Sequence, residues 1–257
     1  MPQILRLMRC GDRLTAMAAE IHELLLLLGR PASGKSETLD YLQRLDPAER
    51  LRRFRIGRLV ALDDFPLLWA WFEEDAILER MGKPRLHTTA DGYFVERHLW
   101  DVLISRLCLE YDKLCAREPD LGLQTTVIIE FSRGSEHGGY TAALDALTDA
   151  VLSRAGALYV SVSFEESLRK NRRRFNASRP DSILEHGLPD EKLEKLYRID
   201  DWNDLKRTDP GHLLVRGHRV PCVVFDNDDD VTTPRGEALG SRLEGSLQRL
   251  WALRLSK

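Results

Sequence analysis

Five short apolar runs, separated by longer stretches with helical spacing, dominate the pattern of hydrophobic and polar positions along the chain. The runs cover residues 23–28, 57–62, 125–130, 158–162 and 220–225. None of them alternates cleanly between apolar and polar side chains, as is typical of strands that helices bury on both faces. The pattern therefore predicts an α/β fold in which five parallel strands are covered by helices on both sides.

Helical spacing fills most of the chain between these runs. The expected helices are residues 34–45, 66–80, 92–117, a block that begins at the capping box 163–166, a block that begins at Pro189, and a closing helix over 234–255. The segment 65–124, between the second and third runs, is long enough to form a helical substrate-binding insertion. We expect one domain over residues 1–257, with residues 1–20 as an N-terminal extension.

Composition narrows the classes of protein that fit this pattern. The chain has 257 residues and a formal net charge of −3, so a global basic surface for nucleic acid or an anionic membrane is absent. No apolar run approaches the length of a membrane-spanning helix, so we expect no membrane partner. The four cysteines are scattered without a CxxC pair, which favours a reducing, cytoplasmic setting.

One glycine-rich stretch follows the first apolar run directly. Residues 29–36, here called the glycine-rich loop, read GRPASGKS and fit the pattern GxxxxGK[ST] at every fixed position. Such a loop surrounds phosphate groups with backbone N–H groups, while Lys35 would reach the β- and γ-phosphates and Ser36 would bind Mg²⁺. The alternative is a chance turn between a strand and a helix. The residues expected to contact a nucleotide are Gly29, Ala32, Ser33, Gly34, Lys35, Ser36 and Glu37.

Acidic residues stand at the ends of the second and third runs, where open α/β sheets bind their ligands. There Asp63 can accept the proton of a substrate hydroxyl, while Asp64 contacts Mg²⁺ through water. Glu130 has the position of a Walker B acid and would also hold Mg²⁺ through water. The alternatives are a solvated turn in which Asp64 caps the next helix, and a plain strand-end acid at Glu130.

Basic residues are concentrated in the run 169–174. Leu168 and Phe175 are seven residues apart and share a helix face, so Asn171 and Arg172 are expected on that inward side. An inward arginine can bind phosphates and stabilise charge that develops during phosphoryl transfer. The alternatives are a solvated basic face and salt bridges at the edge of the core.

Five further residues are candidates for ligand contacts. Arg133, after the third run, can pair with a substrate phosphate or carboxylate, or with an acid of the protein itself. His87, Tyr93 and Arg97 lie in the insertion and either contact an acceptor or serve only as loop and cap residues. Asn227 belongs to an acidic loop after the fifth run, which lacks the glycine and distal glutamate of a calcium loop and is expected beside an adenine.

Together, the glycine-rich loop, the sequence Asp63-Asp64-Phe65, Glu130 and the arginine run resemble the P-loop small-molecule and nucleoside/nucleotide kinase superfamily. Asp-Asp-Phe is similar to the motif of the uridine kinase and phosphoribulokinase-like branch, whose first aspartate, here Asp63, is the catalytic base. A proline stands where that branch often has tyrosine. The resemblance implies a three-layer P-loop fold, a five-stranded parallel sheet in the order 2-3-1-4-5, and a mobile lid at residues 168–189.

The function expected from this resemblance is transfer of the γ-phosphoryl group of ATP, with Mg²⁺, to a hydroxyl or phosphate of a nucleoside, nucleotide or sugar-like metabolite. Lys35 and Ser36 would hold the donor, Asp63 would orient the acceptor, Glu130 would support Mg²⁺, and Arg172 would close from the lid. One alternative is a nucleotide-responsive regulatory protein with slow hydrolysis. Another is a polynucleotide 5′-kinase, which the acidic net charge disfavours.

Overall fold

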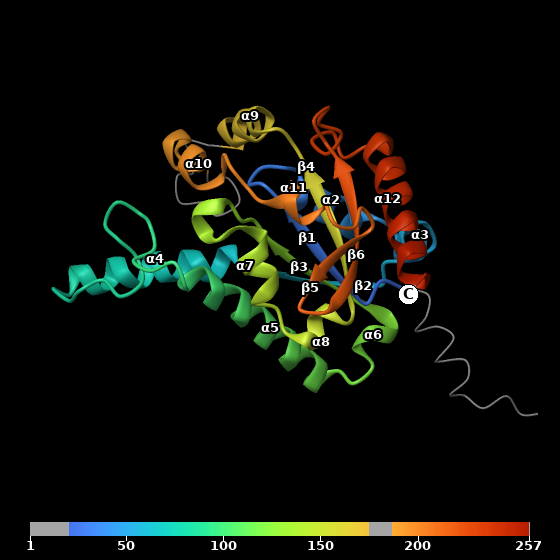
Figure 1. Cartoon of the computed structure of the whole chain (residues 1–257), viewed down its shortest axis with the longest axis horizontal. Coiled ribbons are helices and arrows are strands. Elements are labelled where there is room, and N and C mark those ends of the chain that lie inside the picture. The colour runs from blue at the N-terminus through green and yellow to red at the C-terminus, as the bar shows by residue number, and fades with distance from the viewer. Residues whose placement is uncertain (1–20, 175–186, 257) are drawn as a thin grey trace, which may run out of the picture.

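A six-stranded sheet forms the centre of the computed structural model, which describes residues 21–174 and 187–256 (Figure 1). The strands are β1 (Leu24–Gly29), β2 (Arg58–Asp63), β3 (Thr125–Phe131), β4 (Ala155–Ser161), β5 (His212–Val215) and β6 (His218–Asp226). Their order in the sheet is β2-β3-β1-β4-β6-β5. All neighbours are parallel except β5 and β6, which are antiparallel. The predicted α/β class is therefore confirmed.

The number and order of strands differ from the prediction because of β5. The five expected strands correspond to β1, β2, β3, β4 and β6, and β5 adds an antiparallel edge strand beyond them. A tight turn makes this addition possible, because Arg216 and Gly217 both have positive φ, at 46° and 83°. Turns with two such residues match the twist of a β-hairpin.

Helices cover both faces of the sheet (Figure 1). They are α2 (Lys35–Arg44), α3 (Pro47–Phe54), α4 (Phe65–Arg80), α5 (Leu99–Arg117), α6 (Leu121–Gln124), α7 (Gly139–Asp145), α8 (Asp149–Leu152), α9 (Phe164–Arg174), α10 (Asp190–Tyr197), α11 (Trp202–Leu205) and α12 (Glu237–Leu255), with a 3₁₀ helix η1 (Ser135–His137). Helices α2, α3 and α12 pack on one face, and α5, α7, α8 and α11 pack on the other. Alternate leucines of β1 point into each of these two cores, so β1 is buried on both sides.

The expected insertion contains α4, α5 and α6, but its second long helix is shorter than predicted. Helix α5 begins at Leu99 instead of residue 92. The preceding segment is held in an irregular conformation by Asp75 of α4, whose buried carboxylate accepts hydrogen bonds from the backbone N–H groups of Leu86, His87 and Thr88. These bonds satisfy the buried charge of Asp75 and lower its pKa, although burial alone would raise it.

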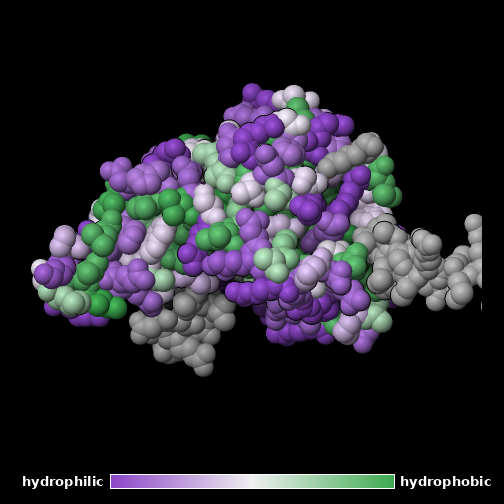
Figure 2. Space-filling model, turned by 90° about the horizontal axis from the view of Figure 1, so that it is seen from below, coloured by the Kyte–Doolittle hydropathy of each residue, from purple (hydrophilic) through white to green (hydrophobic). Residues whose placement is uncertain are grey.

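The far end of α4 projects from the sheet, at the left of Figure 1. Hydrophobic side chains are exposed there among polar ones, at the left end of the space-filling view in Figure 2. They include Ile77, Met81 and Leu86, with exposed fractions of 46%, 65% and 60%. Among the described helices, none is both long and apolar enough to cross a bilayer.

Candidate functional site

A cleft of about 1460 Å³ opens where the parallel strands β2 and β3 end. The glycine-rich loop and α2 form one side, the ends of β2 and β3 form the floor, and α4, η1, α9 and α10 supply the remaining walls. Helices α9 and α10 lie side by side above the strand ends in Figure 1. The carboxyl ends of parallel strands are the usual ligand-binding edge of such sheets.

Two glycines of the glycine-rich loop have positive φ. Gly29 and Gly34 have φ of 149° and 112°, which side-chain-bearing residues rarely adopt. A Cβ on Gly34 would lie 2.4 Å from Thr232 Oγ1 and 2.7 Å from Asn227 Nδ2. The Oγ atom of Ser33 is buried and has no hydrogen-bond partner among the described residues. Ser33 is fully buried and, like Gly29 and Gly34, is not among the residues that line the cleft.

We expect Gly34→Ala to lower the free energy of unfolding by at least about 2 kcal/mol, because it combines an unfavourable φ with a steric clash. Urea denaturation measures this loss. Gly236→Ala is the matched control, since Gly236 has negative φ and open space around it. Equal stability of the two variants would contradict the packing described for the loop.

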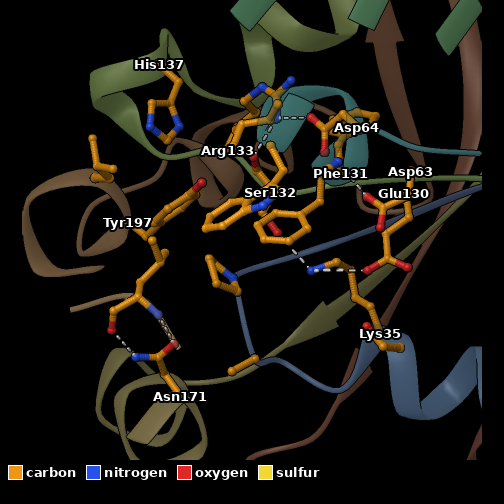
Figure 3. A pocket seen from close by; sticks show the side chains of 18 of the residues that line it. Lys35, Asp63, Asp64, Glu130, Phe131, Ser132, Arg133, His137, Asn171 and Tyr197 are labelled. Carbon is orange, nitrogen blue, oxygen red and sulfur yellow. Dashed lines mark hydrogen bonds and ion pairs between the residues drawn. The ribbon is translucent and has the colours of Figure 1, made fainter. Parts of the chain in front are cut away.

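Lys35 lies folded back into the glycine-rich loop. Its Nζ atom donates hydrogen bonds to the carbonyls of Gly29 and Arg30, at 3.1 and 3.0 Å, and to Ser132 Oγ at 2.8 Å. Glu130 Oε1 is 3.9 Å from the same nitrogen. Burial lowers the pKa of Lys35, while the negative charge of Glu130 opposes this change. The ammonium group thus lies between the loop and the strand-end acids, as Figure 3 shows.

Three side chains hold the glycine-rich loop from outside the cleft. Arg30 donates hydrogen bonds to the carbonyls of Tyr197, Val162 and Arg198 and pairs with Asp200 at 2.8 Å. Ser167 Oγ, in α9, donates to the carbonyl of Pro31 at 2.7 Å.

Asn227 is the third of these side chains. Its Nδ2 donates to the carbonyl of Ser33 at 2.7 Å, and the residue is fully buried. The expectation that Asn227 lies beside an adenine is corrected, because its amide is used to support the loop.

Asp63 and Glu130, here called the carboxylate pair, lie opposite each other at the ends of β2 and β3. Both line the cleft next to Lys35 (Figure 3). Burial raises the pKa of Glu130 to about 7, and burial together with the neighbouring Asp64 raises the pKa of Asp63 to about 6. Two neighbouring carboxylates whose negative charge Lys35 offsets only in part favour a bound cation.

The raised pKa of Asp63 predicts how the stability of the ligand-free protein depends on pH. Between about pH 4 and pH 6 the folded chain retains a proton that the unfolded chain has released, so stability decreases as pH rises through this range. Asp63→Asn removes this effect and should gain stability relative to the wild type, on the order of 3 kcal/mol between pH 4 and pH 8. Thermal denaturation across this range measures it, with Asp120→Asn, an exposed residue outside the cleft, as control. A stability difference that stays constant with pH would contradict the prediction.

Asp64 does not join the carboxylate pair. Its Oδ2 accepts a 2.6 Å hydrogen bond from Nη1 of Arg133, and both side chains are buried. Asp64 and Arg133 both line the cleft, but each neutralises the other here, so the predicted roles of Asp64 in binding Mg²⁺ and of Arg133 in binding substrate gain no support. The predicted helix cap is also different, since Asp63 and not Asp64 accepts the hydrogen bond from the N–H group of Phe65.

The arginines that line the cleft from α9 are Arg173 and Arg174, not Arg172. The Arg172 side chain is 62% exposed and pairs with Asp190. Arg174 lines the cleft and donates hydrogen bonds to both carboxylate oxygens of Glu37, each at 3.0 Å. Asn171 is buried as predicted and binds the backbone of Leu188. The predicted lid also includes residues 175–186, which lie outside the described part of the chain, as does the predicted extension 1–20.

The candidate acceptor residues divide between the cleft and the structure around it. Tyr93 and Arg97 line the cleft, whereas His87 does not. The ring of His87 stacks on Trp71 at 5.0 Å, and its Nδ1 lies 3.7 Å from Asp75. His87 therefore stabilises the segment before α5.

Sequence reasoning missed a group of cleft residues that are separated along the chain. They are Trp69, Trp100, His137, Lys192, Lys195 and Tyr197. His137 Nδ1 accepts a hydrogen bond from Gly134 N–H, and burial together with the charge of Arg133 lowers its pKa to about 3, so the imidazole is neutral. No local motif marks these residues, because they meet only through packing.

The residues present fit ATP and Mg²⁺ in part. The ammonium group of Lys35 beside the glycine-rich loop fits phosphates, and Ser36 is exposed and lines the cleft. The carboxylate pair fits a hydrated divalent cation. A cage of three or more acidic, histidine or cysteine ligands does not occur in residues 21–174 and 187–256.

Comparisons with known proteins give no family for the chain. No protein-family model matches it, and no curated protein sequence matches it. Solved structures do match, among them one described as "Crystal structure of APE1195". That structure is 17% identical in sequence, covers 89% of this chain and 98% of its own, and has a TM-score of 0.38.

Proposed function

We propose that the protein transfers the γ-phosphoryl group of ATP, with Mg²⁺, to a hydroxyl or phosphate group of a small metabolite. The observation that carries this proposal is that Lys35 of the glycine-rich loop and the carboxylates of Asp63 and Glu130 meet in one cleft. Phosphoryl transfer needs positioned reactants and compensation of charge more than covalent help from the protein. This set of side chains supplies both.

Each residue has a separate task in this reaction. Lys35 exchanges its loop carbonyls for the β- and γ-phosphates, and Arg174 approaches the same oxygens from α9. Asp63 holds the acceptor hydroxyl and takes its proton, for which the raised pKa is suited. Ser36 and Glu130 would hold Mg²⁺, which when bound offsets the negative charge of the phosphates. Arg30 and Asn227 keep the loop in place.

The test is an acceptor panel of nucleosides, nucleotides, sugars and aminoglycosides with labelled ATP. We expect one class to accept label at a rate well above ADP release without acceptor. With that acceptor, Asp63→Asn should lower kcat by about 10²- to 10⁴-fold, because it removes the base, while Asp120→Asn should not change it. No acceptor-dependent transfer, or full activity of Asp63→Asn, would count against a phosphotransferase and favour slow nucleotide-dependent switching.

A further inference from the structure

The cleft is larger than a nucleotide at the glycine-rich loop requires. Ligand pockets commonly span about 300–1,000 Å³, and this cleft has about 1460 Å³. The additional space lies away from the loop, between α4, the beginning of α5, η1 and α10. A second compound therefore fits beside the donor.

An unbroken series of aromatic rings forms the wall of this second compartment, here called the aromatic wall. Its members are Trp69, Phe72, Phe94, Trp100, His137 and Tyr197. Consecutive ring centroids are 6.5, 5.9, 4.7, 3.8 and 4.9 Å apart. The first four side chains are only partly buried, so aromatic surface faces the cleft. Such surface favours a flat ring, which can stack or meet it edge to face.

Two lysines of α10 add positive charge at the rim of this compartment. The ammonium groups of Lys192 and Lys195 lie 5.1 and 4.2 Å from the ring centroid of Tyr93. Neither has a carboxylate within ion-pair distance in the described part of the chain. Asp91 interacts electrostatically with both lysines, and Glu96 and Glu136 also line the cleft, so the positive charge is local to α10. His137 is neutral and adds no positive charge to the compartment.

We propose that the aromatic wall and these two lysines form a subsite for an acceptor that carries a planar ring and an anionic group, either phosphate or carboxylate. The ring lies against the wall, and the anion reaches Lys192 and Lys195. The inference rests on the proposed function in one respect: the bound compound is an acceptor only if the protein transfers a phosphoryl group. Binding itself does not depend on transfer.

Isothermal titration calorimetry separates the two requirements. The phosphate arm compares uridine 5′-monophosphate with uridine, which lacks the anion, and with ribose 5-phosphate, which lacks the ring. The carboxylate arm compares 3-(hydroxymethyl)benzoate with its neutral amide. We expect a ring anion in at least one arm to bind about 10-fold or more tightly than its partners, and the responding arm identifies the anion. The proposal would be overturned if a compound without the ring or without the anion bound as tightly as the ring anion, or if neither ring anion bound.

Three variants locate the bound ligand. The double variant Lys192→Gln, Lys195→Gln should bind the ring anion about 10-fold more weakly than the wild type does and should bind uridine equally well. Phe72→Leu should lower the affinity for the ring anion and for uridine by the same factor. Lys113→Gln, on the outer part of α5, should change neither affinity. Repeating each titration with excess ADP and Mg²⁺ excludes binding at the glycine-rich loop. If the lysine variants bind the ring anion as the wild type does, the subsite is wrong.

The outcomes also separate the subsite from the proposed function. Selective binding of a ring anion without phosphoryl transfer would contradict the phosphotransferase and retain the subsite. Transfer from ATP to a compound without a ring or without an anion, at the rate of the ring anion, would retain the phosphotransferase and overturn the subsite.

Discussion

The variant Lys35→Met is expected to transfer phosphoryl groups about 10²- to 10³-fold more slowly than the wild type. Methionine is unbranched and only one atom shorter than lysine, but it has no positive charge to offset the charge on the transferred group. Its effect should appear in kcat more than in KM for the acceptor, since Lys35 lies at the glycine-rich loop, where we propose that the donor binds. Rapid-quench measurement with labelled ATP and the acceptor found in the panel gives both constants.

Lys113→Met provides the control, because this lysine pairs with Glu110 on α5, outside the cleft. Circular dichroism of both variants shows whether the fold is retained. A Lys35→Met variant that folds and keeps more than about a tenth of the wild-type rate would exclude the role assigned to this lysine.

The second large effect is expected for stability. Arg133→Met should lower the free energy of unfolding by about 3–5 kcal/mol, because it leaves Asp64 as a buried and uncompensated carboxylate. The guanidinium group also lies 5.1 Å from the ring of Trp100 and donates to the carbonyls of Ser132 and Trp100. Chemical denaturation measures the loss.

A double variant identifies the cause of this loss. Asp64→Asn together with Arg133→Met removes the uncompensated charge, so it should be more stable than Arg133→Met alone. Arg106→Met, which affects an exposed pair with Glu110, should change stability by less than about 1 kcal/mol. A loss of less than about 1 kcal/mol in Arg133→Met would instead return Arg133 to the list of candidate substrate contacts.

Local patterns in the sequence predicted that Lys35, Asp63 and Glu130 lie close together. The turn at the glycine-rich loop could be predicted because Gly29 and Gly34 adopt positive φ, which glycine tolerates best. Asp63 and Glu130 could also be placed, because strands that are parallel neighbours end at the same edge of the sheet. Helix α9 shows where such reasoning stops. Periodicity predicted buried Asn171 correctly, yet it placed Arg172 inward, whereas the position of α10 draws Arg172 outward to Asp190.

The sequence by itself determined the α/β class, five of the six strands, and the loop and strand-end acids that face the cleft. Only the tertiary structure decided that Asp64 neutralises Arg133, that Arg174 faces the cleft, and that an aromatic wall lines the same cleft as Lys35. The physical reason is distance along the chain. Backbone conformation and strand ends follow from neighbouring residues, whereas ion pairs and ring contacts between remote segments depend on how whole helices pack.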